Sequence, residues 1–520
     1  MVFTRPKWPT SSRLFTIGTA MRTARAPGQT SPSACATGSA SACTNETVGA
    51  DAMSQPNALG VSPAALIWLA VRELPAQVLS IFQARNDRHR TQRDAVTVFG
   101  VRCVSAALLY LSQIVLARWM GSYEYGIYVY VWTWVMILGG IADLGLGVAT
   151  IRFVPQYREN GEPALLRGVV QGARRVALGV GTLIAAVGVA GLYLFEPLDS
   201  HFMLPAYLAL VCVPIYALTW VQDGIGKAFA WMGLSMVPPY VVRPALLLIA
   251  MVAAHAAGMP MEAKTAATAA IVATWGAGIV QTLLMNRRLN ATAGTGDVRY
   301  DFPLWLRTTW PLLVIAASEF TLQSADVLVV SHYMTPTDVG IYFAAAKTMS
   351  LILFVHYAVG SAVANRFAAL GARGDKESLD KFAREAAHWT FWPSLAAGSV
   401  LLLLGVPLLW LFGPQFVDGY PVMLILVVGF LFRASMGPSE FLLNMLGKQS
   451  ISAAVQVTVA LLSVVLNIAL VPHFGLIGAA TATSVALMTG ALLNNVAVSR
   501  TLGIEVAVWR NLFKSQRRGR

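Results

Sequence analysis

The sequence WMGSYEYGIYVYVWTWVMILGGIADLGLGVATIRF occupies residues 119–153, and a shift of 214 residues places it without a gap over residues 333–367. Six of the 35 positions are identical: Met120/Met334, Gly126/Gly340, Ile127/Ile341, Tyr128/Tyr342, Arg152/Arg366 and Phe153/Phe367. These identities lie at the two ends of an apolar run that is long enough to cross a bilayer. They therefore indicate an internal duplication, which is a common plan among membrane transporters.

The composition predicts an all-α polytopic membrane protein. The chain has 520 residues, of which 56% are hydrophobic and only 12% are charged, and its mean hydropathy is +0.61. A soluble domain carries about 25% charged residues. Many apolar runs of about 20 residues recur, as transmembrane helices require. In a membrane protein the net charge of +13 reflects the Lys and Arg residues of the cytoplasmic loops, and it does not indicate nucleic-acid binding.

Cofactor chemistry has no signature in this sequence. The four cysteines form neither a disulfide framework nor a metal-ligand spacing. The segment Gly226-Lys227-Ala228 lacks the glycine spacing and the hydroxyl residue of a phosphate-binding loop. We therefore expect no cofactor, no metal, no nucleic-acid partner and no enzyme activity.

The predicted domains follow hydropathy and charge. Residues 1–60 are an extension outside the fold, either disordered or preceding a true start at Met53. Residues 61–94 form an interfacial amphipathic helix with a basic collar. A six-helix bundle (95–290), a cytoplasmic linker (291–307), a second six-helix bundle (308–500) and a basic tail (501–520) follow. The twelve predicted spans are 96–116, 126–149, 176–195, 202–221, 233–254, 266–285, 310–330, 340–364, 391–412, 420–442, 453–470 and 476–496.

The distribution of basic residues predicts that both termini are cytoplasmic. With the N-terminus inside, the cytoplasmic loops and tail carry 22 Lys and Arg residues, and the opposite loops carry only Arg118 and Lys264. Positive residues gather on the cytoplasmic side of membrane proteins. The bias also supports twelve spans, six in each half, so that the two halves have the same orientation.

Cations within the spans are candidates for binding an anionic substrate, because a buried charge in a membrane costs about 3 kcal/mol or more. Arg243 lies near the middle of the fifth span, and Pro238, Pro239 and Pro244 predict a broken helix around it. Such a break is a plausible anion site; the alternative is a structural ion pair between helices. The further candidates are Arg433, Lys347 and Arg102, of which the last two could instead extend toward the membrane surface.

The seventh span carries Glu319, Gln323 and Asp326 at spacings that place them on one helical face. We expect this face to line a cavity or to pair with Lys347 or an arginine, and the carboxylates to be candidates for ion coupling. The equivalent positions in the first span are Ser105 and Ser112, again on one face.

Residues 116–128 (LARWMGSYEYGIY) and 141–153 (IADLGLGVATIRF) resemble the opening of Wzx-type polysaccharide-biosynthesis flippases. These belong to the MOP superfamily, with the MATE exporters and the lipid II flippase. Residues 325–330 (ADVLVV) and 339–347 (VGIYFAAAK) fit the same pattern. The resemblance covers about residues 95–500.

The resemblance implies two six-helix bundles around a central cationic cavity in the bacterial inner membrane. It implies transfer of an undecaprenyl-diphosphate-linked oligosaccharide to the periplasmic leaflet, for O-antigen, exopolysaccharide or capsule synthesis. The partners would be the lipid-linked oligosaccharide, membrane lipids, and the polysaccharide polymerase with its chain-length machinery. Arg243, Arg433, Lys347 and Arg102 are assigned to the cavity by their depth, and Glu319, Asp326 and Gln323 to H⁺ or Na⁺ coupling.

Two alternatives remain open at this point. A cation-coupled multidrug exporter of the MATE type would share the fold, but its site should be acidic. A membrane-bound polymerase or glycosyltransferase would usually have a large loop for its chemistry, whereas the non-cytoplasmic loops here are short.

Overall fold

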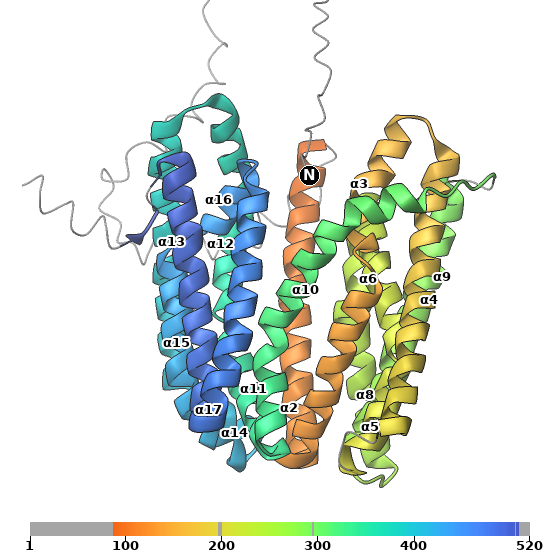
Figure 1. The fold of residues 1–520 in the computed structure, drawn as a ribbon, viewed down its shortest axis with the longest axis vertical. Helices are drawn as coiled ribbons and strands as arrows, with labels where there is room; N and C mark the ends of the chain where they lie inside the picture. The colour runs from red at the N-terminus through yellow and green to blue at the C-terminus, as the bar shows by residue number, and fades with distance from the viewer. Residues whose placement is uncertain (1–86, 196–199, 294–295, 505, 509–520) are drawn as a thin grey trace, which may run out of the picture. The chain divides into compact units, whose positions relative to one another are not determined.

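The two longest helices each reverse direction at one glycine. Helix α2 (Asp87–Ala142) has 56 residues, so as a straight helix it would extend about 84 Å, nearly three times the bilayer core. Gly121 (φ 76°, ψ 171°) interrupts it, and Gly475 (φ 57°, ψ −134°) interrupts α17 (Gln449–Leu502). Glycine tolerates these positive φ values because it has no Cβ. Both reversals lie at the lower end of Figure 1.

The computed structural model describes residues 87–195, 200–293, 296–504 and 506–508, which contain no strand. All of them belong to one compact unit, Gln77–Arg520. The predicted extension (1–60), most of the predicted interfacial helix (61–94) and most of the basic tail lie outside these residues; residues 87–94 belong to α2.

Seven helices and one π-helical segment complete the N-terminal half: α3 (Leu146–Glu159), α4 (Pro163–Phe195), α5 (Ser200–Leu210), α6 (Val213–Ala228), α7 (Met232–Val237), η1 (Pro238–Val242), α8 (Arg243–Ala256) and α9 (Ala263–Ala293). The C-terminal half contains α17 together with α10 (Phe302–Tyr333), α11 (Pro336–Ser350), α12 (Leu353–Arg373), α13 (Lys376–Leu403), α14 (Gly405–Phe412), the 3₁₀ segment η2 (Pro414–Gly419), α15 (Tyr420–Ser435) and α16 (Ser439–Met445).

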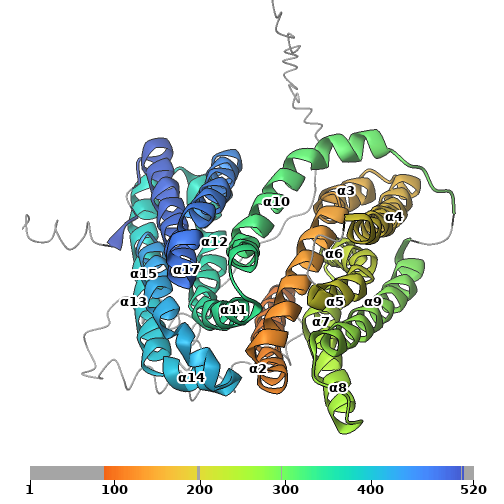
Figure 2. The same ribbon diagram turned by 60° about the horizontal axis from the view of Figure 1, so that its bottom comes forward.

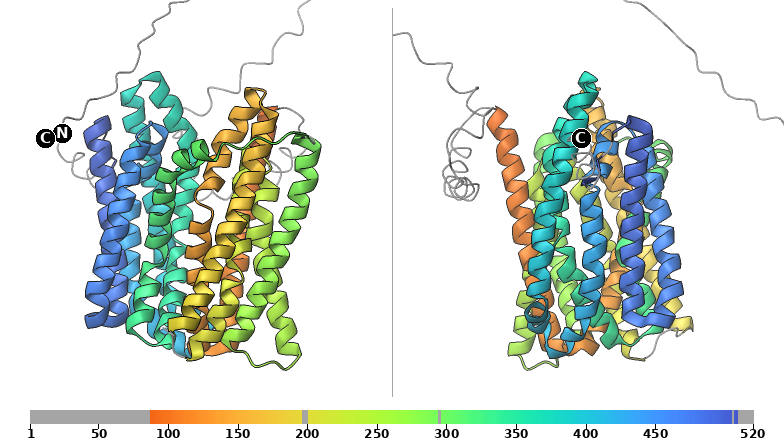
Figure 3. Two further views of the ribbon diagram at one scale, coloured as in Figure 1. Left: turned by 45° about the vertical axis from the view of Figure 1, so that its right-hand side comes forward. Right: turned by 90° about the vertical axis from the view of Figure 1, so that its left-hand side faces the viewer.

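Six of the predicted apolar spans lie within single helices, and the other six cross a break or a junction between consecutive helices. Among the described residues, eight helices are long and apolar enough to cross a membrane, or ten if two bent pairs, bent by 43° and 61°, are single spans. Counting α2 and α17 as two spans each gives twelve, the predicted number. The α3–α4 and α12–α13 turns both lie at the upper end of Figures 1 and 3, and the helix ends beside them carry many of the basic residues. That this end is cytoplasmic stays a prediction.

The duplicated motif joins the two halves. A Cβ at Gly126 would lie 1.7 Å from the backbone oxygen of Pro336, and one at Gly340 would lie 2.6 Å from the backbone oxygen of Ser122. The backbones of α2 and α11 can approach this closely only because neither glycine has a side chain. Ile127 and its equivalent Ile341 are buried beside this contact.

The buried apolar residues form one core that the two halves share and two cores that belong to separate halves. One shared core takes buried residues from both halves, including Tyr125 from α2, Tyr342 from α11 and Phe412 from α14. Toward the other end the halves have separate cores, one around Phe153 and Trp305 and one around Phe367. The halves are therefore packed together at the end where α2 and α17 reverse, and are separately packed at the opposite end.

Helix α10 belongs to both halves. Trp305, in its first turn, is fully buried in the N-terminal core, and its indole Nε1 donates to the Tyr157 hydroxyl at 3.0 Å. Arg299 N donates to Ala164 O at 3.0 Å, which fixes the connection onto the start of α4. Figure 2 shows α10 running from beside α3 to beside α17. The packing thus does not divide at the predicted linker (291–307), because that linker already contains the first turn of α10.

We expect Gly126→Ala to destabilise the joint between the halves, because its methyl group would overlap Pro336. Overpacking of this kind costs about 1–3 kcal/mol, which thermal unfolding of the purified protein would detect. Gly191→Ala in α4 is the matched control, since a Cβ there meets nothing within 4 Å. Equal melting temperatures for the two variants would contradict the assignment of the joint.

Candidate functional site

Arg243 begins a helix after a break, as the prolines predict. Pro238 and Pro239 supply no backbone N–H, and η1 takes a π-helical form between α7 and α8. The Arg243 N–H donates to Pro238 O, five residues earlier. Single π-helical turns are frequent at functional sites.

The Arg243 side chain contacts aromatic rings and has no acidic partner. Its guanidinium carbon lies 5.5 Å from the centre of the Trp132 ring and 5.3 Å from that of Tyr216. Both distances are within the range of cation–π attraction. No Asp or Glu among the described residues forms an ion pair with it. Arg243 is half-buried. The alternative interpretation, in which Arg243 forms a structural ion pair between helices, therefore has no support among the described residues.

Arg102 lies in the same half and is exposed on α2. Tyr240, in η1, is within electrostatic range of both Arg102 and Arg243. Trp132 and Tyr216 could not be predicted as neighbours of Arg243, because they lie on α2 and α6, far from it along the chain.

Arg433 differs from Arg243 because it is paired. Its Nη2 lies 3.3 Å from the Glu440 carboxylate, across the turn between α15 and α16. Glu319 of α10 is also within electrostatic range of Arg433 and Glu440. The charge of Arg433 is thus compensated within the protein, which fits a structural role better than the predicted role of a free cation.

The predicted polar face of α10 is divided between two environments. Glu319 and Gln323 are exposed, and Gln323 Nε2 donates to Glu319 Oε1 at 3.3 Å. Asp326 is buried. It accepts hydrogen bonds from the Tyr342 hydroxyl at 2.8 Å and the Thr483 hydroxyl at 3.4 Å. Asp326 differs from the other two because it lies where α10 packs against Tyr342 of α11 and Thr483 of α17.

Lys347 lies near Asp326 without a hydrogen bond to it. Its Nζ is 5.0 Å from the centre of the Phe343 ring, and its charge interacts with that of Asp326. The predicted pairing of the α10 face with Lys347 thus holds only for Asp326 and only at longer range.

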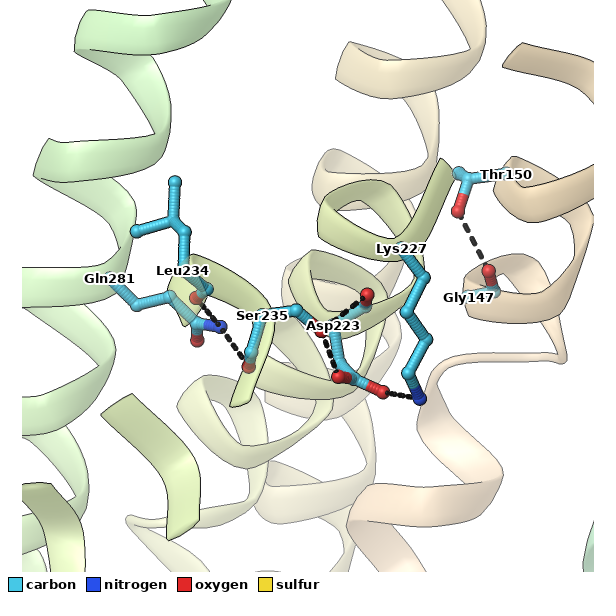
Figure 4. A network of polar contacts seen from close by, with 7 residues as sticks. All are labelled: Gly147, Thr150, Asp223, Lys227, Leu234, Ser235 and Gln281. Carbon is cyan, nitrogen blue, oxygen red and sulfur yellow. Dashed lines mark hydrogen bonds and ion pairs between the residues drawn. The ribbon is translucent and has the colours of Figure 1, made fainter. Parts of the chain in front are cut away.

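A buried polar network joins three helices of the N-terminal half (Figure 4). The carboxylate of Asp223 accepts from the Ser235 hydroxyl and pairs with Lys227. Gln281 Nε2 donates to the backbone oxygens of Leu234 and Ser235, both at 3.3 Å. This network holds α6, α7 and α9 together beside the broken helix. The contacts of Ser235 and Gln281 in this network could not be predicted, because these residues lie 12 and 58 residues beyond Asp223.

Comparison with known proteins identifies the family of this chain. The family model described as polysaccharide biosynthesis protein matches residues 93–365, more than half of the chain. The chain belongs to this family. No curated protein matches the chain.

Solved structures of MOP transporters have the same fold. An inward-facing multidrug resistance MATE transporter has a TM-score of 0.66 at 15% identity, covering 76% of this chain and 94% of its own. The lipid II flippase MurJ, in an inward closed conformation, has a TM-score of 0.61 at 16% identity, covering 78% and 87%. A MOP transporter from Pyrococcus furiosus has a TM-score of 0.57 at 14% identity, covering 79% and 95%. The predicted all-α, multi-pass membrane fold is confirmed.

We expect Asp223→Ala to destabilise the N-terminal half, because it removes the buried carboxylate that accepts from the Ser235 hydroxyl and pairs with Lys227, and leaves that hydroxyl only the backbone oxygen of residue 223 at 3.0 Å. Loss of a hydrogen bond to a charged group costs about 1.5–3 kcal/mol, measurable as a lower melting temperature. Asp380→Ala is the matched control, since its pair with Arg384 is more exposed and such pairs contribute about 0–1 kcal/mol. An equal or larger loss with Asp380→Ala would contradict this view.

Proposed function

We propose that this protein transfers an undecaprenyl-diphosphate-linked oligosaccharide from the cytoplasmic to the periplasmic leaflet of the bacterial inner membrane. The transferred unit would then be used by a polymerase and its chain-length machinery to build a surface polysaccharide. The observation that carries this proposal is Arg243, a cation on a broken membrane helix with no acidic partner among the described residues.

The chemistry of the substrate explains why such a cation is needed. The polyprenyl tail can remain in the lipid, but the diphosphate carries at least two negative charges. Moving it through about 30 Å of hydrocarbon without a polar path is prohibitive. An arginine can bind phosphate oxygens through two parallel hydrogen bonds, and the Trp132 and Tyr216 rings keep Arg243 in place when no anion is bound.

The packing of the halves supports transfer by alternating access. Because the halves share a core at one end and have separate cores at the other, rigid rocking could open one end while closing the other. No bond of the substrate needs to be made or broken, so we propose a transporter rather than an enzyme.

Charge distinguishes this proposal from multidrug export. The fold alone does not fix the sign of the substrate, since the Pyrococcus furiosus transporter is described as having reversed polarity in its binding pocket. Arg243 has no ion-pair partner among the described residues, whereas the acid Asp326 is buried and hydrogen-bonded. This arrangement favours an anionic substrate over a cationic drug.

The experiment is leaflet transfer of a lipid-linked oligosaccharide in proteoliposomes, followed by an enzyme that modifies only the exposed glycan. We expect Arg243→Gln to lower the rate by about 10- to 100-fold, the value of one or two charge-assisted hydrogen bonds. Arg243→Lys should recover part of the rate. Arg384→Gln, which removes a cation already paired with Asp380, is the control.

A wild-type protein that transfers no lipid-linked oligosaccharide, but changes drug susceptibility when deleted, would overturn the proposal in favour of the exporter. Accumulation of the outer-leaflet oligosaccharide in a deletion strain would instead favour a polymerase, which acts after transfer.

For ion coupling we propose Glu319 and Asp326, with Gln323 as the hydrogen-bond partner of Glu319. We expect Glu319→Gln with Asp326→Asn to abolish the dependence of transport on a H⁺ or Na⁺ gradient, because the amides keep the shape but lose the charge. The single variants Glu319→Gln and Asp326→Asn show whether the exposed or the buried carboxylate is needed for the gradient dependence. Unchanged gradient-dependent transport in the double variant would refute this assignment.

A further inference from the structure

Five of the six identities between the two repeats have a packing explanation. Gly126 and Gly340 form the close contact of the halves. The isoleucine, tyrosine and phenylalanine pairs are all buried, with at most 5% exposure. The Met120/Met334 pair packs into or against the shared core. Only Arg152/Arg366 remains, because both arginines are exposed.

The two arginines occupy equivalent positions at the end where the halves have separate cores. Each directly precedes a buried phenylalanine of its own half's core, Phe153 in α3 and Phe367 in α12. The Arg152 guanidinium lies 5.7 Å from the Phe153 ring centre, and that of Arg366 lies 4.3 Å from the Phe382 ring centre. No Asp or Glu among the described residues forms an ion pair with either arginine.

Each arginine lies 26 residues beyond its joint glycine, Arg152 on α3 and Arg366 on α12. The exposed residues of α12 include the small or polar Ala358, Ser361, Ala362, Asn365 and Arg366 as well as Phe354 and Tyr357. The outer face of α4 is different, since it exposes Leu183, Val187 and Leu194 by 62%, 63% and 70%, as contact with lipid tails requires.

Topology alone does not explain why both positions are arginine. A positive charge of either kind satisfies the positive-inside rule, and this chain uses lysine at 376, 381 and 448 on the same predicted side. Arginine differs from lysine in its planar guanidinium, which binds two phosphate oxygens at once. Retention of arginine in both halves therefore points to phosphate recognition.

We propose that Arg152 and Arg366 bind the diphosphate of the lipid-linked substrate from the two sides of the end at which the halves are separately packed, before it reaches Arg243. This proposal rests on the proposed function, since it takes the same substrate class. In this proposal the two repeats contribute equivalent arginines with the same role. Arg243 and Arg433 have no such equivalence, because Arg433 is paired and Arg243 has no ion-pair partner among the described residues.

The test measures binding of undecaprenyl diphosphate to the full chain in nanodiscs, with phosphatidylglycerol as the competing lipid. We expect Arg152→Ala and Arg366→Ala each to weaken binding by about 3- to 10-fold, and the double variant by more than about 10-fold. Lysine at both positions should restore only part of the affinity. Arg158→Ala is the matched control, because Arg158 is exposed on the same helix and its repeat equivalent is Ala372.

Affinities of the double variant equal to those of Arg158→Ala would overturn the proposal and leave the proposed function intact. Equal loss of phosphatidylglycerol binding would also overturn it, by showing that the arginines bind lipid phosphate in general. A wild-type protein without preference for undecaprenyl diphosphate would count against the proposed function itself. An unchanged melting temperature of each variant excludes misfolding as the cause.

Discussion

The close contact between Gly126 and Gly340 is the constraint on which the rest of the structure depends. It allows the equivalent helices of the two repeats to touch backbone to backbone at one end. Side chains then fill a single shared core around the contact. Beyond it the halves have two different cores, and the rocking that we propose would turn about the glycine end.

This arrangement determines which charged side chains have hydrogen-bond or ion-pair partners within the protein. Asp326 lies where α10 meets α11 and α17, and it is fully hydrogen-bonded. Arg433 lies within the C-terminal half and finds Glu440 across a turn. Arg243 follows a π-helical break, where its neighbours are aromatic rings rather than acids. A cation in a membrane without a counter-charge is costly, and this cost falls when an anion binds.

Much of the fold could be predicted because its signals are local. Apolar runs of membrane length, the repeat at 214 residues and the prolines around Arg243 are all readable along the chain. The pairings of side chains were not readable, since they depend on the register between distant helices. Thr483 reaches Asp326 from 157 residues away, and the helical face of Glu319, Gln323 and Asp326 was predicted correctly as a face but not as two environments. The burial of Trp305 against Tyr157, 148 residues earlier, was unreadable for the same reason.

The most direct test of this account measures spin-label distances at both ends of the protein, after replacement of its native cysteines. Labels at exposed Arg158 and Arg373 report the end with separate cores, and labels at exposed Tyr123 and Asp418 report the end with the shared core. With lipid-linked oligosaccharide present, the account predicts a population in which the first distance is shorter and the second is longer. Two distances that stay fixed, or that change in the same direction, would contradict rocking about the glycine contact.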